Sequence, residues 1–231
     1  MRRLILAGGG DAVASRPLDA HLVAWLPPAR PMLYLPVAMN GVEPSYDACF
    51  AWVMSVFAPL GVVDIAMWTD LAGKTVDDLR RFGAVYIGGG NTFRLLHALR
   101  TSGVDRALAT YIADGGSVYG GSAGAIVLGA DIMTAAHADP NTVGLQDTRG
   151  LDVVDGCSIW CHYDPTQAVH VDAYARGHVH PVVALPEEAG IVIEDAMVTA
   201  LGTAPVIVFD GTAHVTVAAP SVVALPRPRT S

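Results

Sequence analysis

Short apolar runs that end in glycine and alternate with segments of helical periodicity are the feature that most constrains the fold of this chain. Five runs in roughly the first 130 residues are almost continuously apolar: residues 3–7, 32–37, 62–68, 84–87 and 117–119. Strands that are covered by helices on both faces have this composition. The segments between them, such as residues 46–59 and 92–100, carry apolar side chains three and four positions apart, as amphipathic helices do. The alternation predicts a three-layer α/β fold with a mostly parallel sheet.

Three glycine-rich turns directly follow predicted strands. They are residues 8–10, 88–92 and 120–124. Open parallel sheets bind ligands where the carboxyl ends of the strands meet the following loops. If the three strands are neighbours, the three turns lie together at one edge of the sheet. The first turn does not match a dinucleotide-binding fingerprint, because residues 11–13 read Asp-Ala-Val and supply no third glycine in register.

The second half of the chain has a different pattern. Residues 131–150 are rich in Ala, Asp, Pro, Asn, Thr and Gly, and they predict a long surface loop near the site, a candidate lid. A strand ending at residues 160–162, a helix over 167–177 and a strand over 182–185 follow. The last apolar runs predict an antiparallel β meander: residues 191–194, 197–201, 206–209 and 214–217. Nothing in the sequence indicates a second domain, so we expect one domain over residues 1–231.

Composition narrows the classes of function. The chain has 231 residues, 52% of them hydrophobic, and a formal net charge of −8 with scattered Lys and Arg, so we expect no nucleic-acid partner. Three cysteines are an odd number and favour free thiols in the reducing cytoplasm. No apolar stretch approaches the roughly 18 residues of a membrane helix. The apolar run at residues 4–7 is too short for a signal peptide.

The turn at residues 120–124 has the Gly-x-Ser-x-Gly pattern of a nucleophile elbow. A chain that turns directly from a strand into a helix holds the central residue in a strained conformation, and flanking glycines leave room for it. Ser122 is then the nucleophile, and the Ala123 N–H at the helix start is an oxyanion donor. The turn with Gly89 and Gly90 is the candidate second donor. Alternatively, Ser122 only caps a helix; the strand-like residues before it and helical residues after it favour the nucleophile.

A serine nucleophile needs a base and an acid that orients the base. His162 follows the apolar run 159–161 at a predicted strand end, where a side chain can face a cleft. The other histidines lie in predicted helices, polar segments, the long loop or the final strands: His21, His97, His137, His170, His178, His180 and His214. Glu187 and Glu188 both follow a strand closed by proline. The local sequence does not choose between them.

Metal binding is a weaker interpretation of the same region. Cys157, Cys161 and His162 would begin a metal site, but no second pair of ligands with structural-zinc spacing follows. The two cysteines are more simply buried small apolar residues. We therefore expect neither a metal nor a cofactor.

Four blocks of the sequence resemble one known family, the S51 serine peptidases. The blocks are residues 86–96, 120–125, 161–163 and 184–187, and the resemblance covers nearly the whole chain. The family includes the aspartyl dipeptidases called peptidase E and, more distantly, the cyanophycinases. The resemblance implies a class I glutamine amidotransferase-like fold, with serine where those enzymes use cysteine.

The resemblance also implies roles for individual residues. It makes Ser122 the nucleophile, His162 the base and Glu187 the acid. The remaining implied site residues are the oxyanion-hole residues Gly89 or Gly90 with Ala123, and the substrate-binding residues Asn91 and Thr92.

The chain departs from peptidase E at two places. Residues 160–161 read Trp-Cys instead of Asn-Pro, and residues 171–176 replace a Glu-Thr-Arg-like stretch. An N-terminal aspartate on the substrate needs a cation to pair with its carboxylate. Arg176 is the expected substrate-binding cation, with Arg149 and His170 as substitutes.

The expected function is a serine peptidase that hydrolyses short peptides through an acyl-enzyme on Ser122, as a dipeptidase or an aminopeptidase with a preference for N-terminal aspartate. We expect a short-peptide substrate, no membrane partner, and a monomer or homodimer. One alternative is an α/β-hydrolase-type esterase that uses Ser122 with His214. The other is a non-catalytic module whose glycine turns bind a small anion at helix N-termini.

Overall fold

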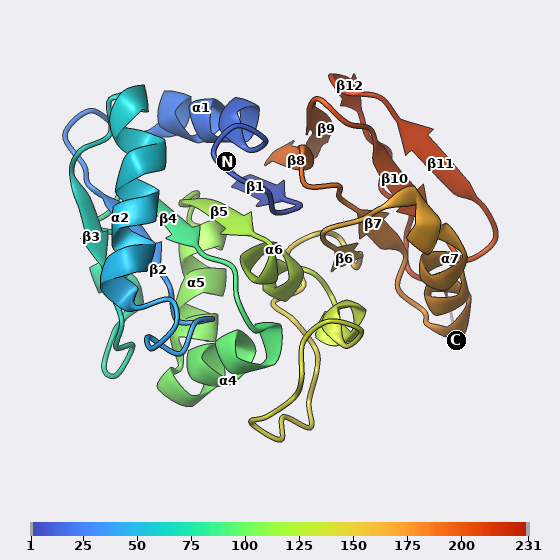
Figure 1. Ribbon diagram of the computed structural model, residues 1–231, viewed down its shortest axis with the longest axis horizontal. Coiled ribbons are helices and arrows are strands. Elements are labelled where there is room, and N and C mark those ends of the chain that lie inside the picture. Colours follow the sequence, from blue (N-terminus) through green and yellow to red (C-terminus); the bar gives the residue numbers. More distant parts are fainter. Residues whose placement is uncertain (1, 230–231) are drawn as a thin grey trace.

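Two β-sheets organise the computed structural model, which describes residues 2–229 (Figure 1). The larger sheet has the strand order β12 (Ser221–Val222), β9 (Met197–Gly202), β8 (Ala189–Glu194), β1 (Arg3–Ala7), β5 (Ser117–Gly121), β4 (Ala84–Ile87), β2 (Met32–Leu35) and β3 (Ile65–Met67). The smaller sheet has the order β11 (His214–Val217), β10 (Val206–Phe209), β7 (Val182–Ala184) and β6 (Ser158–Trp160). The neighbouring strands β1, β5, β4, β2 and β3 pair in parallel. Strands β8, β9 and β12 pair with their neighbours in antiparallel orientation.

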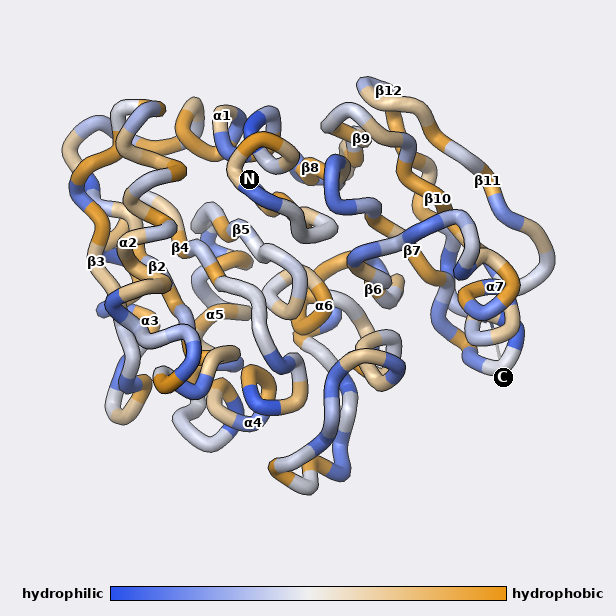
Figure 2. The backbone as a smooth tube through the Cα atoms, viewed as in Figure 1, coloured by the Kyte–Doolittle hydropathy of each residue, from blue (hydrophilic) through white to orange (hydrophobic). Residues whose placement is uncertain are grey.

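Helices cover both faces of the larger sheet, because alternate strand residues point to opposite sides. Ile5 of β1 packs with α1 (Arg16–Trp25) and α2 (Tyr46–Phe57). Its neighbours Leu4 and Leu6 pack with the helices of the opposite face: α4 (Thr92–Ser102), α5 (Val104–Ala113) and α6 (Ala123–Leu128), with α3 (Val76–Leu79) beside α5. Hydrophobic residues recur along the central strands, while hydrophilic residues gather in peripheral loops (Figure 2). The predicted three-layer fold is confirmed.

The smaller sheet carries its own helix and several short turns. Helix α7 (Ala168–Gly177) packs against β7 and β10. Residues 2–229 also contain three short 3-10 helices: η1 (Ala58–Leu60), η2 (Ile132–Ala135) and η3 (Pro165–Gln167). Among residues 2–229, no helix combines the length and the apolar character needed to cross a membrane.

The predicted C-terminal meander is split between the two sheets. The hairpin β8–β9 adds to the larger sheet because β8 pairs with β1, while β10 and β11 pair with β7 in the smaller sheet. The predicted antiparallel strands are confirmed, and the structure divides them between the two sheets. A hairpin is specified locally, whereas the sheet that it joins depends on long-range pairing.

The three glycine turns do converge, as predicted. Strands β1, β5 and β4 are neighbours, with Ala7 opposite Gly121 and Ile87 opposite Gly120. The turns that follow these strands therefore share one edge. The loop over residues 131–150 is tied to the start of α4: the Thr92 N–H donates to the Asp139 carboxylate at 2.8 Å, and the Asn91 amide donates to the Pro140 carbonyl at 2.9 Å.

One carboxyl group lies inside the layer between α1 and the sheet. Asp19 is only 2% exposed, and the Ser15 hydroxyl is 2.7 Å from its carboxylate. Burial raises the pKa of Asp19 to about 6, although the hydroxyls of Ser15 and Tyr119 act in the opposite direction. The folded protein therefore binds the Asp19 proton more tightly than the unfolded chain.

Asp19→Asn should change how stability depends on pH. The stabilisation from the Asp19 proton is complete below the unfolded pKa of about 4 and is lost as pH rises through the folded pKa. Each tenfold change in proton affinity is worth about 1.4 kcal/mol, so the free energy of unfolding of wild type should fall by up to about 3 kcal/mol relative to that of the Asp19→Asn protein between pH 4 and 7. Urea unfolding of both proteins across this range checks it; a constant difference between them would contradict the burial effect.

Candidate active site

Ser122 stands on the turn between β5 and α6 in a strained backbone conformation. Its φ is 51° and its ψ is −114°, a region that non-glycine residues seldom occupy. Two features of the turn maintain this geometry: the Ser122 N–H donates to the Ala7 carbonyl at 3.1 Å, and its carbonyl accepts from the Ala125 and Ile126 N–H groups. Its hydroxyl makes no cap bond to the helix. The side chain of Ser122 therefore does not cap α6, and its hydroxyl is available to the site.

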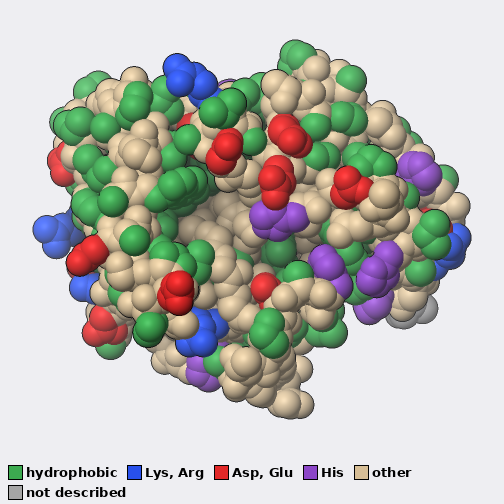
Figure 3. Space-filling view, viewed as in Figure 1, with side chains coloured by type: hydrophobic (Ala, Val, Ile, Leu, Met, Phe, Trp, Pro, Cys, Tyr) green, Lys and Arg blue, Asp and Glu red, His purple; other side chains and the backbone are tan. Residues whose placement is uncertain are grey.

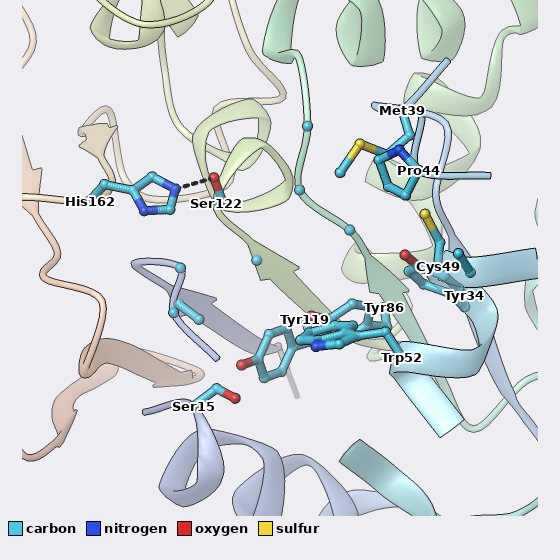
Figure 4. Close-up of a pocket in the computed structure, with 18 residues that line it drawn as sticks. Ser15, Tyr34, Met39, Pro44, Cys49, Trp52, Tyr86, Tyr119, Ser122 and His162 are labelled. Carbon is cyan, nitrogen blue, oxygen red and sulfur yellow. Dashed lines mark hydrogen bonds between the residues drawn. The ribbon is translucent and has the colours of Figure 1, made fainter. Parts of the chain in front are cut away.

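The hydroxyl of Ser122 and two further side chains form a continuous chain of hydrogen-bond distances. Ser122 Oγ lies 2.7 Å from His162 Nε2, and His162 Nδ1 lies 2.9 Å from Glu187 Oε1 (Figure 4 shows the first contact). A carboxylate beside Nδ1 favours the tautomer with its proton on Nδ1. Nε2 is then free to accept the proton of the serine hydroxyl. Between the two adjacent carboxylates, the structure brings Glu187 to the histidine.

The glycine turn at residues 8–10 makes room for the other two members of this chain. A side-chain Cβ at Gly8 would lie 2.0 Å from the Pro186 carbonyl oxygen, and one at Gly10 would lie 2.8 Å from the Glu187 carbonyl oxygen. A Cβ at Gly9, whose φ is +129°, would lie 2.2 Å from His162 Cε1. The sequence identified this turn but did not show what it contacts, because the contacting residues are about 150 or more positions apart.

Three backbone N–H groups beside Ser122 have no acceptor. Within residues 2–229, those of Gly89 and Gly90 donate to neither a backbone nor a side-chain group, and that of Ala123 is the first of its helix. A Cβ at Gly89 would lie 3.3 Å from Ser122 Cβ, so this backbone passes directly beside the serine. The residues expected to bind an oxyanion thus flank the nucleophile candidate.

The expected substrate-binding residues are not all near Ser122. Thr92 lines a cavity that also contains Ser122 and His162. Asn91 instead caps α4, accepting from the Arg94 N–H at 2.8 Å, and holds Pro140. Arg176 pairs with Asp172 on α7. In the described part of the chain, neither Asn91 nor Arg176 lines any of the three cavities that contact His162, and their role in substrate binding stays a prediction.

The remaining alternatives lie elsewhere. Arg149 is paired with Asp147, and His170 packs beside Trp160. His214 begins β11 of the smaller sheet and packs against Phe209, with ring centroids 5.1 Å apart. None of the three lines the cavities around Ser122 formed by residues 2–229.

The cysteines are packing residues, as the sequence predicted. Cys157 and Cys161 are 0% and 3% exposed. The Cys161 thiol lies under the site, 3.5 Å from the Ser122 carbonyl oxygen, and burial raises its pKa. A protonated, enclosed thiol supports the turn without acting as a nucleophile.

Sequence reasoning missed a cavity of about 470 Å³ beside Ser122, which we call the tyrosine cavity. Its floor is Tyr34, Tyr86 and Tyr119, which are aligned in register on β2, β4 and β5. The Tyr86 and Tyr119 rings stack with centroids 4.8 Å apart. The space exists because the same strand faces continue with Gly88 and Gly121: a Cβ at Gly88 would lie 2.9 Å from the Tyr34 ring.

The floor of the tyrosine cavity is electrically neutral. Burial raises the pKa of the Tyr86 and Tyr119 hydroxyls well above their usual range, so both stay protonated at physiological pH. The molecular surface is hollowed at its centre, with hydrophobic side chains on one wall and a histidine beside carboxylates on the rim (Figure 3). A local signal was present in the sequence, since Tyr86 and Tyr119 each stand two residues before a glycine of a predicted turn.

Gly9→Ala should lower the reactivity of the Ser122 hydroxyl while leaving the protein folded. The added methyl group displaces the His162 ring, and a misplacement of about 1 Å can reduce a catalytic rate by about a hundredfold. We expect covalent labelling of Ser122 by a fluorophosphonate to slow by a similar factor. The matched control is Gly177→Ala at the end of α7, where a Cβ meets nothing within 4 Å. Labelling of the Gly9→Ala protein at the wild-type rate, with circular dichroism unchanged, would contradict this role.

Comparison with known proteins identifies relatives of this chain. The sequence model of peptidase family S51 matches residues 4–201. An uncharacterized peptidase of Listeria innocua is 30% identical over 62% of this chain and 70% of its own length. Peptidase E of Shewanella putrefaciens is 32% identical over 53% of this chain and 52% of its own length, so the chain spans about half of that relative.

Two crystal structures share the fold. One, a candidate peptidase E from Listeria monocytogenes EGD-e, aligns with a TM-score of 0.67 and 23% identity over 87% of this chain and 98% of its own. The other, a peptidase from an acI-B1 actinobacterium, aligns with a TM-score of 0.72 and 18% identity over 97% of each chain. With a family match over most of its length and the same fold as these structures, the chain belongs to peptidase family S51.

Proposed function

We propose that the protein is a serine peptidase that hydrolyses short peptides through an acyl-enzyme on Ser122. The observation that carries the proposal is the connected Ser122–His162–Glu187 geometry, with contacts of 2.7 and 2.9 Å. Family membership and relatives named as peptidases support it. The assignment of the three side chains to catalytic roles rests on this geometry.

In the first half of the reaction, His162 Nε2 accepts the Ser122 proton as Oγ attacks the scissile carbonyl carbon. The negative charge that develops on the carbonyl oxygen is bound by the free N–H groups of Ala123 and of Gly89 or Gly90. The Glu187 carboxylate stabilises the imidazolium through Nδ1. His162 then returns the proton to the leaving amine, and the carbon–nitrogen bond breaks.

In the second half, a water molecule attacks the ester that joins the acyl group to Ser122. His162 accepts the water proton and later donates it to Ser122 Oγ, which restores the free enzyme. The cycle consumes one water molecule and one peptide bond. It needs no group beyond those of the chain.

The esterase alternative is not favoured. It requires His214 near Ser122, but His214 belongs to the smaller sheet and packs on Phe209. A module that only binds anions explains the free N–H groups, yet it leaves the aligned histidine and glutamate without a purpose.

Glu187→Gln should lower kcat on a cleaved dipeptide by about a hundredfold to ten-thousandfold, because an amide N–H opposite Nδ1 favours the tautomer with its proton on Nε2. Glu188→Gln removes the same charge one residue away and should change kcat by less than about threefold. Steady-state assays of both variants check this. Equal losses in the two variants would contradict the assignment of Glu187.

Ser122→Ala and His162→Ala should each lower kcat by several orders of magnitude, while the oxyanion donors leave a residual rate of roughly a thousandfold over water. His214→Ala is the matched control and should keep wild-type kcat. The same dipeptide assay separates the proposals: wild-type turnover by Ser122→Ala would end the peptidase proposal, and collapse only in His214→Ala would restore the esterase.

A further inference from the structure

The tyrosine cavity lies on the side of Ser122 that receives the acyl part of a substrate. In Figure 4, His162 is on one side of Ser122, and the cavity residues Met39, Cys49 and Tyr34 are on the other. His162 has to protonate the leaving amine, so the leaving group lies beside the imidazole. The side chain of the residue that becomes the acyl-enzyme is therefore directed into the tyrosine cavity.

The lining of this cavity suits an aromatic ring. Above the three tyrosines, the walls are Met39, Pro44, Ala48, Cys49 and Trp52. Trp52 of α2 is 40% exposed even though it is large and apolar, so it presents an indole surface at the cavity. Aromatic rings pack well against one another in offset or edge-to-face geometry. The volume of about 470 Å³ is within the range of roughly 300–1,000 Å³ typical of ligand sites.

The cavity offers no fixed cation for an acidic side chain. Within residues 2–229, no Lys or Arg lines the tyrosine cavity or the two other cavities that contact His162. Its one basic group is His162 itself, which is already engaged by Ser122 and Glu187. Below the floor, the Asp19 carboxyl contacts Ser15, which lines the cavity.

One candidate cation, Arg94, lines a neighbouring cavity. This neighbouring cavity has a volume of about 580 Å³ and shares only Met39 with the tyrosine cavity. Placing a carboxylate among neutral rings without a partner has a large free-energy cost. An aspartate side chain is therefore a poor occupant, whereas an apolar ring gains from burial.

We propose that the enzyme cleaves short peptides whose acyl-side residue is aromatic, with that side chain bound in the tyrosine cavity. This substrate class rests on the serine peptidase function proposed above. It replaces the expected preference for N-terminal aspartate by a preference for phenylalanine or tyrosine at the same position.

A panel of dipeptides tests the proposal directly. The substrates are Phe-Ala, Tyr-Ala, Ala-Ala, Asp-Ala and the reversed dipeptide Ala-Phe, with fluorophosphonate labelling of Ser122 measured in parallel. We expect kcat/KM for Phe-Ala to exceed that for Ala-Ala by at least about tenfold and that for Asp-Ala by at least about a hundredfold. Phe-Ala should also exceed Ala-Phe, since only the acyl-side ring enters the cavity.

Two variants on the same helix test the site of recognition. Ala48→Phe adds a ring at an exposed position of α2 that lines the cavity, and it should lower the ratio of kcat/KM between Phe-Ala and Ala-Ala at least about tenfold. Ala51→Phe adds the same ring at an exposed position of α2 that does not line the cavity. It should leave the ratio at the wild-type value.

The outcomes separate the substrate class from the peptidase function. If Ser122 is labelled but Asp-Ala is cleaved best, or if Ala-Phe exceeds Phe-Ala, the inference about the cavity is overturned while the serine hydrolase remains. An unchanged ratio in Ala48→Phe would also overturn it. If Ser122 is not labelled and no dipeptide is cleaved, the peptidase proposal fails and the aromatic substrate fails with it.

Discussion

Two consecutive carbonyl groups at the carboxyl end of β1 anchor Ser122 and His162, the two residues that we propose react with the substrate. The Ala7 carbonyl accepts from the Ser122 N–H at 3.1 Å, and the Gly8 carbonyl accepts from the His162 N–H at 2.9 Å. Ser122 and His162 both have positive φ values, 51° and 52°, which are unfavourable for residues other than glycine. Both residues whose side chains meet thus have an unfavourable backbone conformation, and the end of one strand anchors both of them.

This anchoring is possible because glycines allow the strand ends to approach closely. Side chains at Gly8 and Gly9 would overlap the segments that carry Glu187 and His162. On the other side of β5, a Cβ at Gly124 would lie 2.2 Å from the Ile87 carbonyl oxygen, so α6 can start directly against β4 only with glycine there. The missing side chains at Gly8 and Gly124 let main-chain segments pack directly against one another, and the missing side chain at Gly9 leaves room for the His162 ring.

The same edge also provides the space for a substrate. The strand face that carries Tyr34, Tyr86 and Tyr119 continues into Gly88 and Gly121, so the aromatic row ends and a cavity begins. In both β4 and β5, a tyrosine is followed two positions later by a glycine. The tyrosines form the neutral floor of the tyrosine cavity, and the glycines leave its space open beside Ser122. The proposed catalytic geometry and the proposed substrate preference both depend on where β4 and β5 stop carrying side chains.

Much of this was predictable from local sequence, and the remainder depended on distant contacts. Apolar runs predicted β1 and β4 with their observed bounds, and the turn pattern predicted the strand–Ser122–helix geometry. The choice between Glu187 and Glu188 was not local, because it is decided by which carboxylate faces a residue 25 positions earlier. The N-cap role of Asn91 was also readable locally, because its place before a helix is typical of an N-cap. The division of the C-terminal strands between two sheets depends on the pairing of residues 189–194 with residues 3–7, which are distant in the sequence.

The proposed mechanism requires Ser122 to carry the acyl group during turnover. Rapid mixing of the enzyme with an activated ester of N-acetylphenylalanine, followed by acid quenching and mass spectrometry, measures this most directly. We expect a transient mass increase equal to the acyl group, mapped to the peptide that contains Ser122 and absent from the Ser122→Ala protein. Product formation without any adduct, or an adduct on another residue, would contradict it.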